Sequence, residues 1–249
     1  MPYKQKIIKS FNSSAYSYHN AADVQPQVAE RLAQYLSGVN PASILEIGCG
    51  TGFFSQHLQQ HFPLAQIELT DIAPAMLENC KQRFPSHSNI KLTQMDGEAI
   101  NLPTEFDLIA SSMAFHWFQD IESSLQKIIA KLTSRGRLIF AMLGENSLSE
   151  WREICELHAI TVTPSFISTR ELQRFFPELK IQVELTKQFY RNAYEFLKTL
   201  KLIGANAPHI KHRPQTSGSL RRLMRLLDKK YPQGINISYE IIYGSYEKQ

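Results

Sequence analysis

The sequence predicts an α/β fold: a mostly parallel, seven-stranded β-sheet covered by helices on both faces. Apolar segments typical of strands alternate at short spacing with amphipathic segments typical of helices. A glycine-rich turn follows the first of these strands and leads directly into a helix. The chain has 249 residues, of which 43% are apolar, so a single domain with its own core is expected over residues 1–249.

Composition argues against several classes of protein. The three cysteines, Cys49, Cys80 and Cys155, form no C-x-x-C pair, so no metal site is expected and a reducing, cytoplasmic location is favoured. The net charge of +4 is mild and no dense basic run contains interleaved aromatic residues, so no nucleic-acid partner is expected. No apolar stretch approaches the ~20 residues of a membrane span, and residues 1–10 lack the apolar core of a signal peptide.

Residues 1–40 precede the first predicted strand and are expected to form an N-terminal helical flap. Val28 and Leu32 share one face of a helix in this region. Ahead of them, Tyr16 and Tyr18 stand close together in a polar stretch. Two interpretations stay open, because the pattern alone does not separate them. The segment closes over a bound ligand, or it is a helix packed on the domain.

The first strand covers residues 44–47, and a helix begins near Thr51, so the turn between them contains Gly48, Gly50 and Gly52. Glycines in such a turn adopt backbone angles closed to other residues, and without a Cβ they let a ligand lie against the backbone. The helix N-terminus adds free N–H groups and the positive end of a dipole. The turn therefore predicts a ligand-binding site.

Two ligands compete for this turn. A nicotinamide or flavin dinucleotide requires G-x-G-x-x-G, but Phe53 occupies the position of the last glycine. The pattern that begins at Glu46 and continues with the three alternate glycines resembles instead motif I of class I S-adenosylmethionine (SAM) methyltransferases. In that family the turn lies against the amino-acid portion of SAM. A structural turn without a ligand is the third interpretation.

The strands that follow carry acidic residues at their ends. The strand over residues 66–71 ends in Asp71, about twenty residues past the turn, a distance at which a carboxylate reaches ribose hydroxyls. Ile72 follows, and Met76 lies in a helix that Pro74 opens. Ile72 and Met76 flank the adenine or belong to the core.

The third and fourth strands end in further polar residues. The third, within residues 89–98, ends at Asp96 and Gly97, and Asp96 is placed to accept from the adenine amino group. An aspartate that caps a turn is the alternative, and it is the commoner one. The fourth strand, residues 106–112, carries Ser111 near its end. Because the carboxyl ends of parallel strands meet at one edge, these residues are expected to lie beside the glycine turn.

The remaining elements complete the predicted sheet. A fifth strand covers residues 135–142 and a sixth covers 180–191, and a last strand over 235–243 is expected to pair antiparallel beside the sixth. The segments 144–179 and 192–233 are expected to be insertions that form a helical lid and the substrate site.

The whole chain resembles the malonyl-[acyl-carrier protein] O-methyltransferases of biotin synthesis, the BioC family. Motif I is shared by very many methyltransferases, whereas the N-terminal segment and the segment near residue 200 are more specific. His116 stands where many members have Gln, and Arg135-Gly136 replaces the usual Pro-Gly or Gly-Gly. Neither change removes a group that the chemistry requires. The segments that carry the resemblance are residues 10–29, 45–52, 112–117, 146–148 and 197–205.

This resemblance implies a Rossmann-like class I SAM methyltransferase. Its reaction would be methylation of the free carboxylate of malonyl-acyl-carrier protein, with S-adenosylhomocysteine as the product and the ester entering biotin (pimelate) synthesis. One alternative is a carboxyl or other O-methyltransferase that acts on a free small molecule. Another is a SAM-binding assembly factor that acts through a protein partner. A nicotinamide enzyme is the third, disfavoured by Phe53. The cofactor-binding candidates are Glu46, Gly48, Gly50, Gly52, Asp71, Ile72, Met76, Asp96, Gly97 and Ser111.

Methylation of a carboxylate requires no general base, because this nucleophile is already ionised at neutral pH. The protein must hold the oxygen and the methyl group in line, exclude water and select the carboxylate, for which a cation is suited. The candidates for positioning are Tyr16, Tyr18, His116 and Trp117. The candidates for the cation are Arg152, Arg170 and Arg191, and those for docking the acidic carrier protein are Arg221, Arg222 and Arg225. For each arginine, a solvated surface charge is the alternative.

Overall fold

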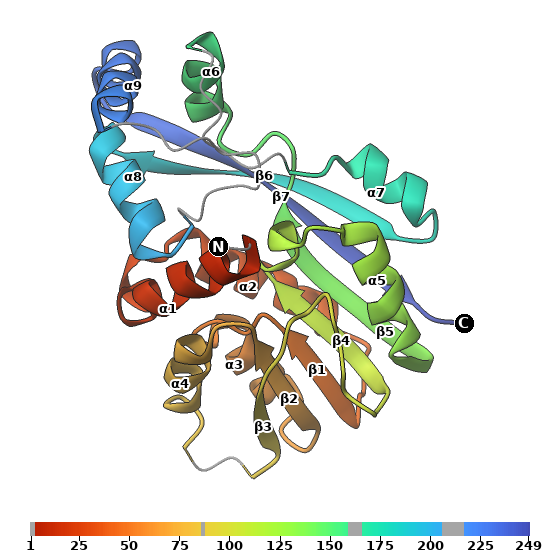
Figure 1. Cartoon of the computed structure of the whole chain (residues 1–249). Helices are drawn as coiled ribbons and strands as arrows, with labels where there is room; N and C mark the ends of the chain where they lie inside the picture. Colours follow the sequence, from red (N-terminus) through yellow and green to blue (C-terminus); the bar gives the residue numbers. More distant parts are fainter. Residues whose placement is uncertain (1–2, 86–87, 159–165, 206–216) are drawn as a thin grey trace.

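The computed structural model describes residues 3–85, 88–158, 166–205 and 217–249. Within them, seven strands form one sheet in the order β3-β2-β1-β4-β5-β7-β6 (Figure 1). Neighbouring strands run parallel from β3 to β5, and β7 is antiparallel to both β5 and β6. The predicted α/β fold with a mostly parallel sheet is therefore confirmed. The strands are β1 (Ser43–Ile47), β2 (Gln66–Asp71), β3 (Ile90–Gln94), β4 (Phe106–Ser112), β5 (Leu132–Leu143), β6 (Lys180–Tyr190) and β7 (Ile235–Glu247).

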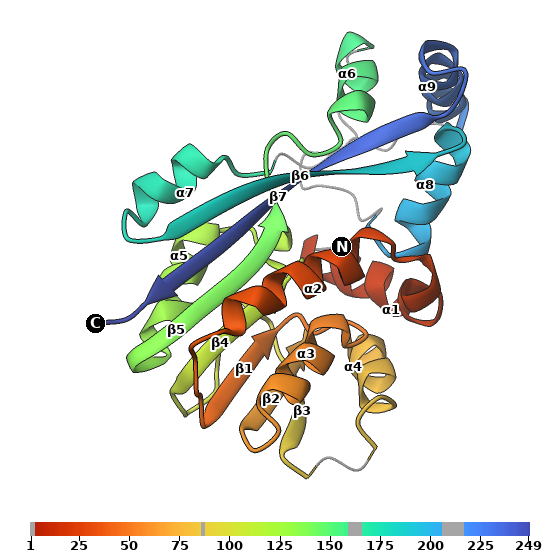
Figure 2. The ribbon, with the colours of Figure 1, turned by 180° about the vertical axis from the view of Figure 1, so that it is seen from behind.

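Helices cover both faces of the sheet (Figures 1 and 2). On one face, Leu32 and Phe54 belong to a buried core cluster, and on the other face Leu125 and Leu172 belong to a second cluster. Each such side chain contributes roughly 1.5–3 kcal/mol when it is fully buried. The helices are α1 (Tyr3–Ala21), α2 (Val24–Ala33), α3 (Phe53–His61), α4 (Pro74–Lys81), α5 (Ile121–Ala130), α6 (Ser149–Leu157), α7 (Thr169–Phe175), α8 (Ala193–Leu202) and α9 (Ser217–Lys230), with 3₁₀ turns η1 (Gln34–Leu36) and η2 (Phe115–Trp117). In the described part of the chain, no helix is long and apolar enough to cross a bilayer.

The helices α6, α8 and α9 gather at one end of the β6–β7 pair (Figure 1). Phe196 of α8 is fully buried and packs edge-on against Trp151 of α6, with ring centroids 6.0 Å apart. It also contacts Tyr190 at the end of β6, at 5.4 Å. These elements belong to the segments 144–179 and 192–233, of which residues 159–165 and 206–216 lie outside the described part.

The N-terminal helix α1 is fastened between two other elements. On one side, the Ser17 hydroxyl donates to the carbonyl of Leu202 at the end of α8, at 2.8 Å. On the other side, the Asn12 side-chain oxygen accepts from the backbone N–H of Ala75 in the first turn of α4, at 3.0 Å. The helix thereby bridges the parallel half of the sheet and the C-terminal helices.

Candidate functional site

A cavity of about 160 Å³ lies at the C-terminal edge of the parallel strands. The turn after β1 and the segments that follow β2, β3 and β4 form its floor. Lys4, Ile7, Phe11 and Tyr18 of α1 line it as well, together with residues at the end of α8. This is the edge at which open α/β sheets bind their ligands.

The glycine turn leaves room for a ligand at one position. Gly48, Gly50 and Gly52 all have positive φ angles, of 74°, 54° and 89°. A Cβ on Gly48 would lie 2.4 Å from the Cβ of Ala114, so packing requires glycine there, whereas one on Gly52 would lie 3.1 Å from the sulfur of Cys80, a tight contact. A Cβ on Gly50 would meet nothing within 4 Å. Gly50 also lines the cavity, so its backbone faces open space that a ligand can fill.

Two carboxyl groups lie beside this turn. Asp71 at the end of β2 accepts from the backbone N–H of Gly50 at 2.9 Å and from that of Ala73 at 2.8 Å. Burial raises the pKa of Asp71 to about 6, although these hydrogen bonds act in the opposite direction. Glu46 is 1% exposed and accepts from the Ser55 hydroxyl at 2.6 Å. Burial, with a smaller contribution from Asp71, raises the pKa of Glu46 to about 8.

Two polar atoms at the cavity lack partners. Among the described residues, the hydroxyl oxygen of Thr51 and Nδ1 of His116 are buried without any hydrogen bond, and both residues line the cavity. A buried polar group without a partner destabilises a folded protein by about 1–3 kcal/mol. Such groups concentrate where a protein receives a ligand.

The far side of the cavity holds a small ionic cluster. Lys4 of α1 donates to Asp96 and forms an ion pair with Glu98 at 2.9 Å. Asp96 Oδ1 also accepts from the backbone N–H of Glu98 at 3.0 Å, so Asp96 caps the turn after β3. A Cβ on Gly97 would lie 2.6 Å from the side chain of Ile47, so packing requires this glycine too. Ile72, Met76, Asp96 and Gly97 all line the cavity.

Aromatic rings form the wall between α1 and η2. Trp117 packs edge-on against Phe11 at 5.4 Å, and Tyr18 contacts Phe53 at 6.4 Å. Burial and the nearby Asp71 raise the pKa of Tyr18, so its hydroxyl stays protonated at neutral pH.

Two backbone conformations beside this wall are unusual. Met113 and Leu148 have positive φ angles of 58° each, and both line the cavity. Strained residues of this kind cluster at functional sites.

Several of the residues predicted from the sequence do not line the cavity. Tyr16 is 95% exposed, because residues two positions apart on α1 point to opposite sides and Tyr18 faces inward. Ser111 is fully buried and donates to the carbonyl of Ile47 at 2.8 Å, so it joins β4 to β1 instead. Gly52 supports the turn from behind and is not part of the lining.

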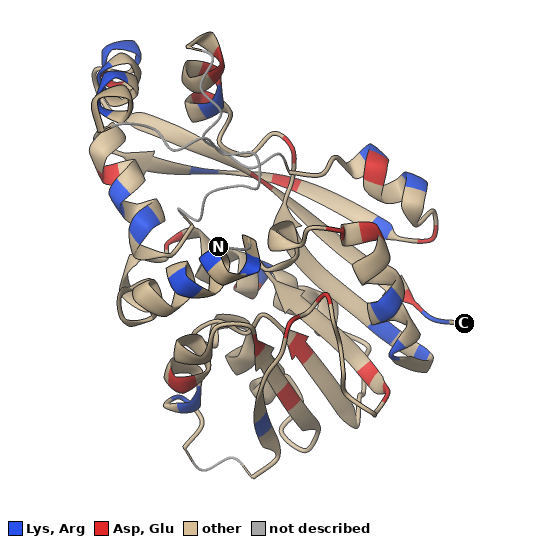
Figure 3. Cartoon of the chain, viewed as in Figure 1, with Lys and Arg blue, Asp and Glu red and all other residues tan. Residues whose placement is uncertain are grey.

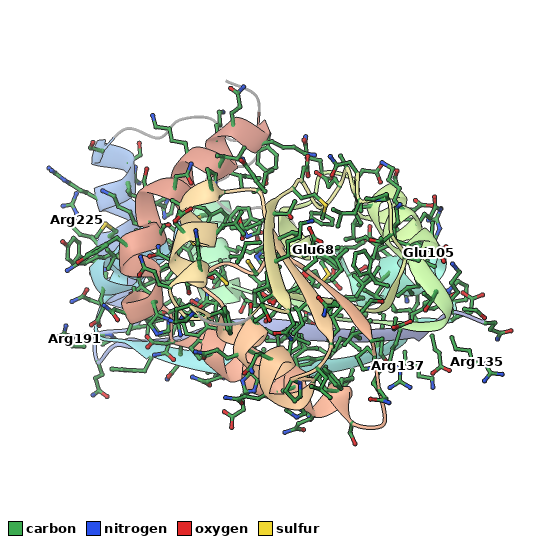
Figure 4. The ribbon with its side chains drawn as sticks, turned by 90° about the horizontal axis from the view of Figure 1, so that it is seen from below. Glu68, Glu105, Arg135, Arg137, Arg191 and Arg225 are labelled. Atoms are coloured by element: carbon green, nitrogen blue, oxygen red, sulfur yellow. The ribbon has the colours of Figure 1, made fainter. Side chains whose placement is uncertain are left out.

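The six candidate arginines also lie away from the cavity lining. Arg152 donates to the carbonyl of Glu145, and Arg191 pairs with Glu195 at 2.8 Å. The side chains of Arg170, Arg221, Arg222 and Arg225 are exposed. Figure 4 shows Arg191 and Arg225 at the same end of the molecule, directed outward.

The structure adds lining residues that were not among the sequence candidates. They come from α1, from the glycine turn, from the turns around η2 and β5, and from the C-terminal segments. Most of them lie in the segments that carry the family resemblance, but the sequence pattern could not bring them together, because they meet only through tertiary packing. These residues are Lys4, Phe11, Thr51, Met113, Leu148, Phe166, Leu200, Ile203 and Tyr239.

Comparisons with known proteins find similar methyltransferases. Residues 45–140 match the family described as a methyltransferase domain. The chain is 32% identical to a malonyl-[acyl-carrier protein] O-methyltransferase of Magnetococcus marinus, over 98% of this chain and 92% of that protein. It is 28% identical to a malonyl-[acyl-carrier protein] O-methyltransferase 1 of Ilyobacter polytropus, over 98% and 95%. It is also 32% identical to a biotin biosynthesis bifunctional protein BioCD of Bordetella avium, over 98% of this chain and 52% of that protein.

Solved structures share the fold. The YcgJ protein of Bacillus subtilis superimposes with a TM-score of 0.63 at 14% identity, over 90% of this chain and 98% of that chain. A phosphoethanolamine N-methyltransferase 2 of Haemonchus contortus in complex with S-adenosyl-L-methionine has a TM-score of 0.63 at 13% identity, over 100% of this chain and 60% of that chain. At such low identity the likeness concerns the fold alone.

Proposed function

This chain belongs to the family of malonyl-[acyl-carrier protein] O-methyltransferases, and on that basis we propose that it transfers the methyl group of SAM to the free carboxylate of a malonyl group on acyl-carrier protein. The products are the malonyl methyl ester and S-adenosylhomocysteine, and the ester serves biotin synthesis. The observation that carries the proposal is the glycine turn. Gly50 exposes its backbone to an open cavity, beside a buried carboxyl group at the end of the next strand.

The residues present suit SAM. The open backbone at Gly50 and the unpartnered hydroxyl of Thr51 would hold its amino-acid portion. Asp71 would accept from the ribose hydroxyls, and Ile72 and Met76 would flank the adenine from either side. SAM supplies an electrophilic methyl group bound to a positively charged sulfur. The chain supplies the position of the acceptor and an environment that excludes water.

The acceptor reacts without the help of a base. A malonyl carboxylate is ionised at neutral pH, and its oxygen forms the new bond to the methyl carbon while the carbon–sulfur bond breaks toward sulfur. No proton moves in this step. His116 would be a poor base, because burial lowers its pKa to about 3. This agrees with a mechanism that needs no base.

The carrier protein would dock along α9 and α8. Arg221, Arg222 and Arg225 are exposed on α9, and Lys198 and Lys201 are exposed on α8. Figure 3 shows basic residues on α9 and α8 at one end of the molecule, above those of α1. The end of α8 lines the cavity, so the basic band leads to its mouth. A positive surface steers an acidic partner by long-range attraction.

The segment 1–40 would act as a flap and the segments 144–179 and 192–233 as a lid. The support for the flap is the position of α1, which lines the cavity and is joined to α4 and to the end of α8 by a few side-chain hydrogen bonds. Local opening of this helix would admit SAM. The whole reaction would take place in the cytoplasm, where its buried cysteines stay reduced.

Acceptor comparison tests the proposal. Initial rates are measured with malonyl-acyl-carrier protein, malonyl-CoA, free malonate and acetyl-acyl-carrier protein, each with saturating SAM. We expect the highest kcat/KM for malonyl-acyl-carrier protein. Acetyl-acyl-carrier protein should not be methylated, because it has no free carboxylate. A higher kcat/KM for free malonate would indicate a small-molecule methyltransferase. SAM binding without transfer to any malonyl compound would indicate an assembly factor.

A further inference from the structure

His116 lines the cavity together with the glycine turn. It belongs to η2, directly after β4, and two residues before it Ala114 packs against Gly48 of the glycine turn. Its ring contacts Trp117 at 5.4 Å and stands edge-on to Phe166 at 5.8 Å. Aromatic neighbours on both sides make the surroundings of the imidazole apolar.

The two nitrogens of this ring differ in their surroundings. Nδ1 is buried and has no hydrogen-bond partner among the described residues. Nε2 is not among the buried unpartnered atoms and no described residue bonds to it, so it is the accessible nitrogen of a ring that lines the cavity. Burial keeps the ring neutral at pH 7 by lowering its pKa, so it carries a single N–H. A buried N–H without an acceptor is rarer in proteins than an acceptor without a donor, which places that hydrogen on Nε2.

The described lining of the cavity contains no lysine or arginine side chain without an acidic partner. Lys4 is the one lysine or arginine there, and Asp96 and Glu98 occupy it. A substrate carboxylate that enters beside η2 therefore meets neutral donors. Thr51, which is proposed to hold SAM, and His116 are two such donors without a partner in the described chain, and His116 is the one that belongs to η2.

We propose that the Nε2–H of His116 binds the free carboxylate of the substrate, at the oxygen that does not attack, and thereby selects malonyl over uncharged acyl groups. This assignment rests on the proposed function.

A neutral donor suits this reaction better than a cation. The carboxylate loses its negative charge as its oxygen bonds to the methyl carbon and the carbon–sulfur electron pair moves to sulfur. A close cation would stabilise the starting charge more than the transition state, and such binding does not accelerate a reaction. A neutral N–H binds the carboxylate but stabilises its starting charge less than a cation does, so it raises the barrier to methyl transfer less. It also lies in an apolar wall, where a hydrogen bond is stronger than in water.

Three substitutions of His116 distinguish the role of Nε2 from that of Nδ1. The amide of His116→Gln reaches the position of Nε2, the amide of His116→Asn reaches that of Nδ1, and His116→Phe keeps a ring without either. We expect His116→Phe to raise KM for malonyl-acyl-carrier protein about 10- to 100-fold, the loss of one hydrogen bond to a charged group, with a smaller change in kcat. His116→Gln should restore KM to within about threefold of the unmodified chain, and His116→Asn should resemble His116→Phe.

Acetyl-acyl-carrier protein gives the matched control, because it lacks the free carboxylate. As a competitive inhibitor it should bind the unmodified chain and His116→Phe equally well, and SAM affinity by calorimetry should not change. A KM for His116→Phe equal to that of the unmodified chain would overturn the assignment, and so would a KM closer to normal in His116→Asn than in His116→Gln. It would also be overturned if His116→Phe lost as much affinity for acetyl-acyl-carrier protein as for malonyl-acyl-carrier protein. Absence of methyl transfer by the unmodified chain would overturn the proposed function itself.

Discussion

Substitution of Gly50 by alanine separates the ligand role of the glycine turn from its structural role. Gly50 has a φ angle of 54°, and a Cβ there would meet nothing within 4 Å. An alanine at positive φ destabilises the fold by about 1–2 kcal/mol, but in this case no clash adds to that figure. The new methyl group would instead occupy the space where the amino-acid portion of SAM is proposed to lie. We expect SAM affinity to fall at least ~10-fold, equivalent to about 1.4 kcal/mol.

Two matched glycines act as controls for this prediction. Gly38 lies in a turn away from the cavity, with a φ angle of 74° and open space around its would-be Cβ. Gly38→Ala should lose the same stability as Gly50→Ala and keep its full affinity for SAM. Gly48→Ala would bring its Cβ to 2.4 Å from that of Ala114, so it should be less stable than either. Overpacking of this kind adds about 1–3 kcal/mol to the loss.

The assays are calorimetric titration with SAM and urea unfolding at equilibrium. If Gly50→Ala bound SAM as tightly as the unmodified chain, the ligand would not lie against this turn and the reasoning would be refuted. If Gly38→Ala also lost affinity, the effect would reflect general destabilisation.

Three further predictions concern stability, the flap and docking. The pKa of Glu46 is raised to about 8 from 4.5, so this group should lower the unfolding free energy of the ligand-free chain by about 3 kcal/mol as the pH rises from 5 to 8. Glu46→Gln should make this dependence shallower in urea unfolding, and Asp71, whose pKa is raised to about 6, accounts for the remainder. An unchanged slope would contradict the buried acid. Asn12→Ala removes one of two side-chain hydrogen bonds between α1 and α4 and should speed release of S-adenosylhomocysteine in stopped-flow experiments, whereas Ser13→Ala, which loses only a bond within α1, should not. Arg222→Glu on α9 should raise KM for the carrier-protein substrate mainly at low salt. Arg135→Glu at the opposite end of the molecule, labelled in Figure 4, should leave that KM unchanged; equal effects of the two would count against docking at α9.

Local sequence patterns predicted the sheet and the glycine turn well. The strands predicted at 66–71 and 106–112 have those same bounds in β2 and β4, because each is a short apolar run between turn residues. Asp71 lies beside Gly50 because both come at the C-terminal ends of neighbouring parallel strands. Information of this kind is contained within a few tens of residues.

Contacts between distant segments could not be predicted in the same way. Lys4 and Asp96 are 92 positions apart, and nothing near either residue indicates the other. Ser17 fastens α1 through a backbone carbonyl of Leu202, an acceptor that nearly every residue offers, so the sequence carries no mark of it. Tyr16 is different, because the spacing of Ile7, Phe11 and Ala15 at every fourth position already indicates which face of α1 turns inward.

Mass spectrometry of the acceptor tests the central claim most directly. The chain is incubated with methyl-labelled SAM and malonyl-acyl-carrier protein, and the label is located on the prosthetic arm. Our account predicts one labelled methyl group on the terminal carboxylate of malonyl, released by mild alkali as expected for an ester. Label on a protein side chain, or none on the malonyl group while SAM is bound, would contradict it.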